Sequence, residues 1–120
     1  MRKYVLVVDD SPTDRQMVTT LLQKEGYAVT TAIDGEDALE KIAAEQPPLI
    51  VLDIVLPKMN GYQVLRQLKS APETRNIKVI LVSSKNQEAD KFWGLKQGAD
   101  DYIAKPYPDT ALLSAVARLF

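Results

Sequence analysis

Short apolar runs alternate with amphipathic stretches along the chain, and this alternation predicts repeated strand–helix units. The apolar runs are rich in Val, Ile and Leu, and each is followed by a stretch with the period of a helix. Strands that alternate with helices form a parallel sheet covered on both faces, so the pattern predicts a small doubly wound α/β fold. The expected strands are 4–8, 28–31, 49–53, 78–82 and 101–104.

Turn and capping residues mark where the intervening helices begin and end. Ser11 and Pro12 begin the first helix and Gly26 ends it, whereas Asp34 is expected to cap the second helix and the fourth ends near Gly98. The side chains expected to face the core are Met17, Val18, Leu21 and Leu22 in the first helix, Ala38, Leu39 and Ile42 in the second, Val64, Leu65 and Leu68 in the third, and Leu112, Leu113, Val116 and Leu119 in the last.

Composition and charge narrow the function. The length predicts one domain, residues 1–120, and the 46% hydrophobic and 26% charged residues are typical of a globular protein. A formal net charge of −1 gives no global attraction to nucleic acid or anionic lipid, and no apolar run has the length of a membrane span or signal-peptide core. We therefore expect a cytoplasmic protein that neither binds nucleic acid directly nor inserts into a membrane.

The residue types present restrict the chemistry further. The chain contains no Cys and no His, which excludes thiol chemistry, zinc–thiolate sites and imidazole bases. Oxygen and amine groups remain. They gather at the carboxyl ends of the expected strands, where ligand sites of open parallel sheets lie. The residues at these ends are Asp9 and Asp10 after the first strand, Asp53 at the third, Ser83 at the fourth and Lys105 at the fifth.

This convergence predicts a metal-assisted phosphoryl site, although each residue alone could be an ordinary turn, cap or surface residue. Three neighbouring carboxylates raise each other's pKa unless a cation compensates, and Mg²⁺ suits a site of oxygen ligands, with Asp9 and Asp10 as metal holders. Asp53 is then the candidate nucleophile that forms an acyl phosphate. Lys105 would place a positive charge on the phosphoryl oxygens, and Ser83 would donate its hydroxyl to one of them.

Four motifs closely resemble the receiver domain of bacterial two-component response regulators, over essentially the full chain. They are VVDDSPTDR, LIVLDIVLPKMNGYQVL, VILVSSK and GADDYIAKPY, in that family's order and approximate spacing. The resemblance implies a flavodoxin-like fold with five helices and strand order 2-1-3-4-5. It also implies phosphorylation of Asp53 by a histidine kinase or phosphotransfer domain. Mg²⁺ would be bound by Asp9, Asp10, Asp53 and the backbone carbonyl of Val55.

Further roles are implied by the resemblance alone. Ser83 and Tyr102 are similar to the family's switch pair, in which the hydroxyl moves toward the phosphoryl group and the ring turns inward; by sequence alone Tyr102 is simply a strand aromatic. The Lys105–Pro106 bond is similar to a cis peptide of the family. Val55 and Lys85 lie where the family tunes hydrolysis, and because an apolar Val55 orients no water, we expect a phosphoryl lifetime that is not especially short.

The stretch DKFWGLKQGADDY resembles single-domain regulators linked to type IV pili and twitching motility. Phe92 and Trp93 are neighbours in the fourth helix and point about 100° apart, so only one is expected to be fully inward. Two interpretations stay open. Both side chains are mostly core, or Trp93 helps to form a surface for a partner protein.

The leading interpretation is a signalling receiver, not a turnover enzyme. Phosphorylation of Asp53 would change the face built from the fourth helix, fifth strand and last helix and so control a protein partner. A dehalogenase-like phosphatase would need an acid where Val55 stands, and a nucleotide or flavin phosphate would be repelled by DDSPTD. A phosphorylation-independent adaptor with the same fold remains the other alternative.

Overall fold

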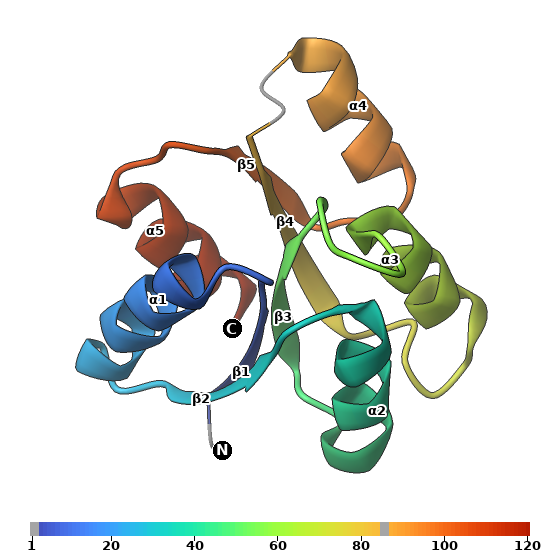
Figure 1. Cartoon of the computed structure of the whole chain (residues 1–120), viewed down its shortest axis with the longest axis horizontal. Coiled ribbons are helices and arrows are strands. Elements are labelled where there is room, and N and C mark those ends of the chain that lie inside the picture. Colours follow the sequence, from blue (N-terminus) through green and yellow to red (C-terminus); the bar gives the residue numbers. More distant parts are fainter. Residues whose placement is uncertain (1–2, 85–86) are drawn as a thin grey trace.

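The computed structural model describes residues 3–84 and 87–120, in which five strands and five helices alternate along the chain (Figure 1). The strands are β1 (Tyr4–Val8), β2 (Ala28–Ala32), β3 (Leu49–Asp53), β4 (Lys78–Ser83) and β5 (Asp101–Ala104). The helices are α1 (Pro12–Lys24), α2 (Gly35–Glu45), α3 (Gly61–Ser70), α4 (Glu88–Lys96) and α5 (Asp109–Leu119). The predicted strands are confirmed, with β2 and β4 one residue longer than expected.

The strands form one parallel sheet in the order β2-β1-β3-β4-β5, which confirms the flavodoxin-like, doubly wound architecture. The chain moves from β1 outward to β2 and then crosses back to β3, so a topological switch point lies between β1 and β3. Val8 pairs with Leu52 in this register, and Asp53 pairs with Val82. The residues that follow β1 and end β3 are therefore neighbours at the carboxyl edge of the sheet.

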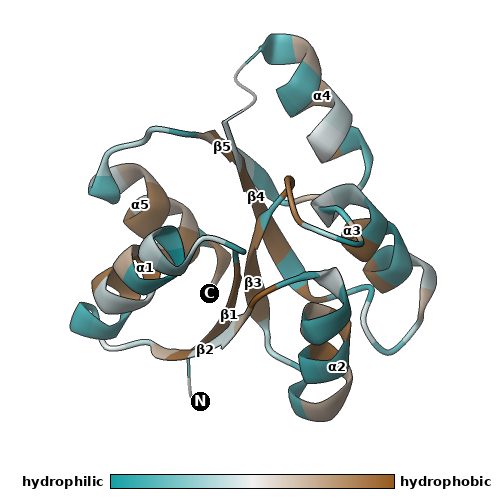
Figure 2. Cartoon of the chain, viewed as in Figure 1, coloured by the Kyte–Doolittle hydropathy of each residue, from teal (hydrophilic) through white to brown (hydrophobic). Residues whose placement is uncertain are grey.

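Two apolar layers hold the helices onto the sheet. In Figure 1, α1 and α5 cover one face, and α2, α3 and α4 cover the other. Alternate residues of β1 supply the two layers, because Val5 and Val7 pack with α1 and α5 while Leu6 and Val8 pack on the opposite side. All five residues of β3 are buried, as expected for a central strand, and the strands are the most apolar part of the chain in Figure 2.

The capping predictions for the first two helices are confirmed. The Asp14 N–H donates to Ser11 Oγ at 3.3 Å, and the Asp37 N–H donates to Asp34 Oδ1 at 2.8 Å. Gly26 follows α1 with a φ of 90°, a left-handed backbone conformation that favours glycine. The loops that begin α1 and α2 are therefore fixed by local hydrogen bonds.

Two helix-facing predictions are wrong. Met17 is 63% exposed because it lies at the rim of a groove beside α5, while Val18 and Leu22 fill the interior below α1. Phe92 and Trp93 are 65% and 48% exposed, so neither is inward and neither is mostly core. The position of α4 that meets the sheet is taken by a glycine, which leaves the bulky neighbours on the outer face.

No helix among the described residues has the length and apolar character to cross a membrane.

Candidate phosphoacceptor site

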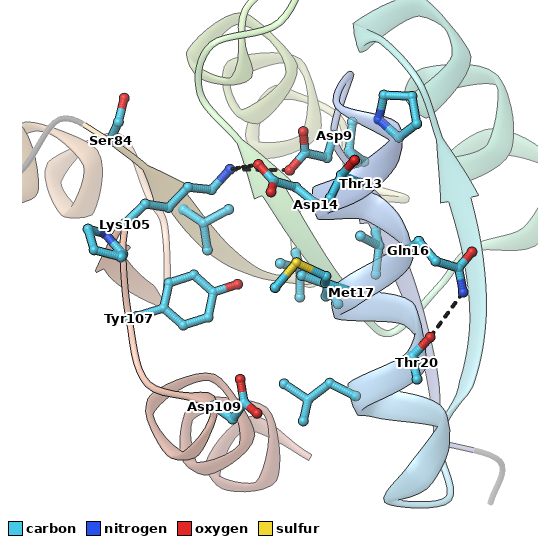
Figure 3. A pocket seen from close by; sticks show the side chains of 18 of the residues that line it. Asp9, Thr13, Asp14, Gln16, Met17, Thr20, Ser84, Lys105, Tyr107 and Asp109 are labelled. Carbon is cyan, nitrogen blue, oxygen red and sulfur yellow. Dashed lines mark hydrogen bonds and ion pairs between the residues drawn. The ribbon is translucent and has the colours of Figure 1, made fainter.

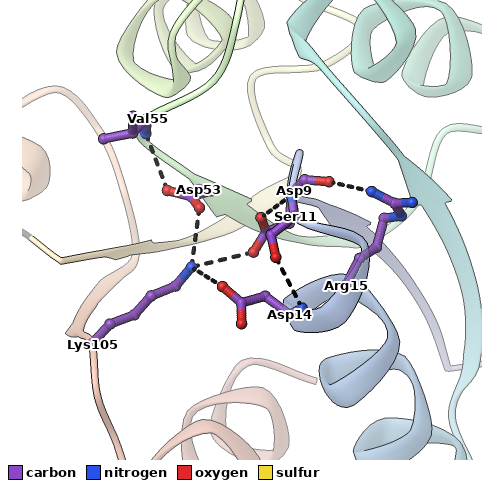
Figure 4. Close-up of polar contacts among 7 residues, drawn as sticks. All are labelled: Asp9, Ser11, Asp14, Arg15, Asp53, Val55 and Lys105. Carbon is purple, nitrogen blue, oxygen red and sulfur yellow. Dashed lines mark hydrogen bonds and ion pairs between the residues drawn. The ribbon is translucent and has the colours of Figure 1, made fainter.

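The ammonium of Lys105 is the centre of a cluster of acidic side chains at the carboxyl edge of the sheet (Figure 4). Lys105 Nζ lies 3.0 Å from Asp53 Oδ2, 3.2 Å from Asp9 Oδ2 and 3.4 Å from Asp14 Oδ2. Asp9 and Asp53 are buried, whereas Asp10 is exposed. The structure therefore brings together residues from the β1–α1 loop, α1, β3 and the segment after β5.

Local contacts hold the β1–α1 loop in place around Asp9. The Ser11 N–H donates to Asp9 Oδ1 at 2.9 Å, and Arg15 Nη1 donates to the Asp9 backbone carbonyl at 2.9 Å. One carboxylate oxygen of Asp9 thus belongs to the loop, and the other faces Lys105. The hydrogen bond from Ser11 fixes the direction of the Asp9 side chain, and the second carboxylate oxygen still takes part in the acidic cluster.

The two carboxylate oxygens of Asp53 also have different partners, one in the loop after β3 and the other Lys105. Its Oδ1 accepts the Val55 N–H at 3.1 Å, while its Oδ2 accepts from Lys105. The first residue of α3, Gly61, packs directly above, because a Cβ on Gly61 would lie 2.4 Å from the Asp53 carbonyl oxygen. A capping box between Asn60 and Gln63 begins α3 at this point.

The acidic cluster has the donor set that a hard divalent cation prefers. One carboxylate oxygen from each of Asp9, Asp10 and Asp53 lies within 4.8 Å of the other two. Mg²⁺ is held in proteins by a few carboxylates together with retained waters, so the residues present fit this ion. The carbonyl of Val55 as a further ligand stays a prediction, since the contact shown for Val55 is through its N–H.

Burial and charge shift the pKa values of the two central groups. Burial raises the pKa of the Asp53 carboxyl above its ordinary value; Lys105 and the Val55 N–H oppose the rise, and the charge of Asp9 adds to it. Burial lowers the pKa of the Lys105 ammonium, but Asp53 and Asp9 outweigh that effect, so its pKa lies above the ordinary value. Lys105 therefore stays charged throughout the neutral range.

Ser83 and Tyr102 lie on neighbouring strands beside this cluster. Ser83 is fully buried, and its carbonyl accepts the Lys105 N–H at 2.7 Å. Tyr102 is only 5% exposed, so its ring is turned inward. Burial raises the pKa of the Tyr102 hydroxyl, and a side-chain hydrogen bond with Ser83 opposes the rise. The Lys105–Pro106 bond that follows is cis, and Lys85 falls outside the described residues.

A groove of about 1040 Å³ runs from this cluster between α1 and α5 (Figure 3). Asp9, Asp14 and Lys105 stand at one end of it, and Met17 and Tyr107 line its sides. Burial raises the pKa of the Tyr107 hydroxyl; Lys105 opposes the rise, and Asp9, Asp14 and Asp109 add to it. The groove leaves the cluster open to an approaching group.

Two contacts of the site were missed at the level of sequence. Asp14 carries no predicted role, yet it contacts Lys105; its position in the first turn of α1, three residues after Ser11, is the available signal. Arg15 was given no role, and its bond to the Asp9 carbonyl depends on the fold of the loop. No local pattern marks such a contact.

Comparisons with known proteins identify the family. The model of the family described as response regulator receiver domain matches residues 5–117. The chain belongs to this family. It is 44% identical over 112 residues to Protein PilH of Pseudomonas aeruginosa, covering 93% of each chain, and 44% identical to Protein PilG of the same organism, covering 93% of this chain and 83% of PilG.

Solved structures agree with this assignment. A putative response regulator from Chloroflexus aurantiacus has a TM-score of 0.94 at 29% identity, over 99% of this chain and 98% of that chain. Chemotaxis protein CheY4 of Vibrio cholerae has a TM-score of 0.92 at 30% identity, over the whole of both chains. By contrast, the chain spans only 44% of the regulatory protein PhoP of Bacillus subtilis, to which it is 43% identical. Receiver domains of this family are signalling regulators that depend on phosphorylation and Mg²⁺.

Proposed function

We propose that this chain is a single-domain response regulator that accepts a phosphoryl group on Asp53 from a histidine kinase or phosphotransfer domain. The main observation in support is that Asp53 lies 3.0 Å from the Lys105 ammonium, beside the carboxylates of Asp9 and Asp10. A histidine kinase takes its phosphoryl group from ATP, and for this reason the proposed location of the protein is the cytoplasm. The protein would be phosphorylated and later dephosphorylated, and it would not act as a turnover enzyme.

The proposed chemistry is transfer of one phosphoryl group between two side chains. An oxygen of Asp53 attacks the phosphorus, the new O–P bond forms as the N–P bond of the donor phosphohistidine breaks, and the electron pair stays on the imidazole nitrogen. Asp9, Asp10, Asp53 and the Val55 carbonyl would hold Mg²⁺, which supplies positive charge close to the phosphoryl oxygens. Lys105 would then turn from Asp53 Oδ2 to a phosphoryl oxygen, and the Ser83 hydroxyl would donate to another.

The output would be a change in the surface formed by α4, β5 and α5. Tyr102 lies in β5 below α4, and Phe92, Trp93 and Leu95 are exposed on α4. Exposed aromatic side chains are common anchors for protein partners. The similarity to PilH and PilG supports a partner in a pilus-based motility pathway. Protein–protein contact would therefore transmit the phosphorylation signal.

Acetyl phosphate with Mg²⁺ tests the phosphoacceptor assignment. Intact-mass measurement is expected to show the gain of one phosphoryl group, which Asp53→Asn and EDTA abolish. Asp109→Asn is the matched control, because it removes an exposed carboxylate from α5 at the far side of the groove. No gain with any small donor or kinase would contradict the proposal and favour a phosphorylation-independent adaptor.

The phosphoryl lifetime is a second testable part of the proposal. The Val55 side chain is 56% exposed and has no polar atom that could orient an attacking water. Once formed and separated from the donor, the acyl phosphate is expected to decay slowly. Intact-mass measurements over minutes would show how much of the phosphoryl group is retained. Val55→Asn should shorten that lifetime. A half-life of about a second or less in the unmodified chain would contradict this expectation.

A further inference from the structure

Gly94 is the one residue of α4 that is buried in the described part of the chain, and its backbone faces Tyr102. A Cβ at this position would lie 2.8 Å from Tyr102 Cδ2, 3.2 Å from Tyr102 Cε2 and 3.0 Å from Leu81 Cδ1. Real side chains do not approach at the shortest of these distances. The volume that a side chain would need at position 94 is therefore filled by the Tyr102 ring.

Glycine in the middle of a helix needs a reason, because it weakens the helix relative to alanine. A special backbone conformation is not the reason here, since Gly94 lies inside α4 and is not among the residues of positive φ. Close approach to the aromatic ring is the contact that explains it. The adjacent Trp93 and Leu95 point to the exposed side of the same helix.

We propose that Gly94 is a positioning residue of the switch: the side chain that it lacks leaves the space into which the Tyr102 ring turns. This inference rests on the proposed function, together with the switch role that the family resemblance implies for Ser83 and Tyr102. The ring in this position lies under α4 and hydrogen-bonds to Ser83. Gly94 thus links the Ser83–Tyr102 pair to the helix that carries the exposed aromatic side chains.

Gly94→Ala tests the link directly. The added methyl group overpacks the space and is expected to lower the population of the inward ring about tenfold, equivalent to about 1.4 kcal/mol. The measurement is the ring NMR signal of Tyr102 in tyrosine-labelled protein with Mg²⁺ and acetyl phosphate, assigned with Tyr102→Phe and probed with a soluble paramagnetic agent. Phosphoryl uptake by Asp53, followed by intact mass, should be retained, because the atoms nearest to the added methyl group belong to Tyr102 and Leu81.

A double variant separates this role from a merely structural one. In a Tyr102→Ala background the ring is gone, so Gly94→Ala should stabilise the protein against urea, because alanine is the better helix former. In the background with Tyr102 the same substitution should destabilise it. Loss of stability in both backgrounds would overturn the proposal, since the clash would then be with Leu81. If Gly94→Ala alone does not fold, recovery of folding in the double variant supports the proposal.

The two hypotheses fail in different ways. A chain that takes up no phosphoryl group contradicts the proposed function, but the urea comparison needs no phosphoryl group and still tests Gly94. A Gly94→Ala variant that is phosphorylated and keeps the Tyr102 ring shielded from the paramagnetic agent, as in the unmodified chain, overturns the inference about Gly94.

Discussion

Asp53 is a buried carboxylate that shares one ammonium with two other acids. The charge of Lys105 is divided among Asp53, Asp9 and Asp14, so it compensates none of them fully. Burial raises the pKa of Asp53, and the short contact with Lys105 opposes the rise without cancelling it. The ionised form of Asp53 is therefore less favourable in the folded protein than in the unfolded chain.

The first prediction concerns Asp53→Asn and pH. Because the folded-state pKa of Asp53 is above its unfolded value, stability contributed by the protonated form is lost as pH rises from about 3.9 through the folded-state pKa. The uncharged Asn avoids this loss, so the variant should have the higher free energy of unfolding at pH 7 in EDTA. The difference should disappear below about pH 3.9. Urea denaturation at both pH values measures it, and a variant less stable at pH 7 contradicts it.

The second prediction concerns the additional carboxylate, Asp14. Its side chain is 47% exposed, so Asp14→Asn should change stability by less than about 1 kcal/mol. The variant frees Lys105 from one partner and removes a negative charge near the incoming phosphoryl group. We expect the initial rate of phosphorylation by acetyl phosphate to rise by about two- to fivefold at low salt and the effect to shrink at high salt. An unchanged or slower rate at low salt would show that Asp14 does not compete for Lys105.

At the scale of elements, the approach of α3 to the end of β3 sets the position of the acceptor loop. Gly61 makes this approach possible, because any side chain there would collide with the Asp53 backbone. The Gly61 N–H also donates to the Ile54 carbonyl at 2.8 Å, which closes the loop between the two elements. The loop that carries Val55 is thus held at both ends.

Gly61→Ala is the third prediction. The added Cβ must push α3 away from β3, so we expect a loss of stability of about 1–3 kcal/mol by urea denaturation and a slower phosphorylation of Asp53. Arg66→Ala, on the exposed face of the same helix, is the control and should change stability by less than about 0.5 kcal/mol. Equal effects of the two substitutions would show that the close approach at Gly61 has no energetic weight.

The elements differ in how well their sequences predict them. The strands could be located because buried parallel strands are continuous apolar runs, as in β3. The outer face of α4 could not, because helical spacing shows that Phe92 and Trp93 diverge but not which direction the sheet occupies. The buried position is Gly94, which has no side chain and hence no hydrophobic signal. The contact of Asp14 with Lys105 likewise depends on how α1 is placed on the sheet.

At the scale of the whole molecule, strand order explains why the candidate site could be anticipated. The order β2-β1-β3-β4-β5 places the carboxyl ends of β1 and β3 side by side, with β4 and β5 next to them. Asp9, Asp53 and Lys105 therefore meet although they are far apart in the sequence. Strand order does not predict the inward position of the Tyr102 ring, because that position depends on packing against α4.

The fourth prediction is that Mg²⁺ stabilises the molecule as a whole. An ion that binds only the folded state adds about 1.4 kcal/mol when its free concentration is ten times its Kd, and the midpoint of thermal unfolding should rise by about 4 °C for each kcal/mol. Asp10→Asn should lose most of this rise, because it removes one of the three carboxylates that would hold the ion. Scanning calorimetry in MgCl₂ and in NaCl of equal ionic strength measures it, and an equal rise in both chains would contradict it.

The amine at the centre of the site follows the last strand, 96 positions after the first carboxylate that it contacts. A nascent chain on the ribosome exposes Asp9 and Asp53 long before Lys105 is synthesised, and the pairing of β5 with β4 is what places Lys105 beside them in the folded structure. Until then the acidic edge has no ammonium to draw in a phosphate donor. Phosphoryl uptake on Asp53, as proposed, would therefore begin only after β5 has joined the sheet, and shorter nascent chains would not compete for the phosphate donor.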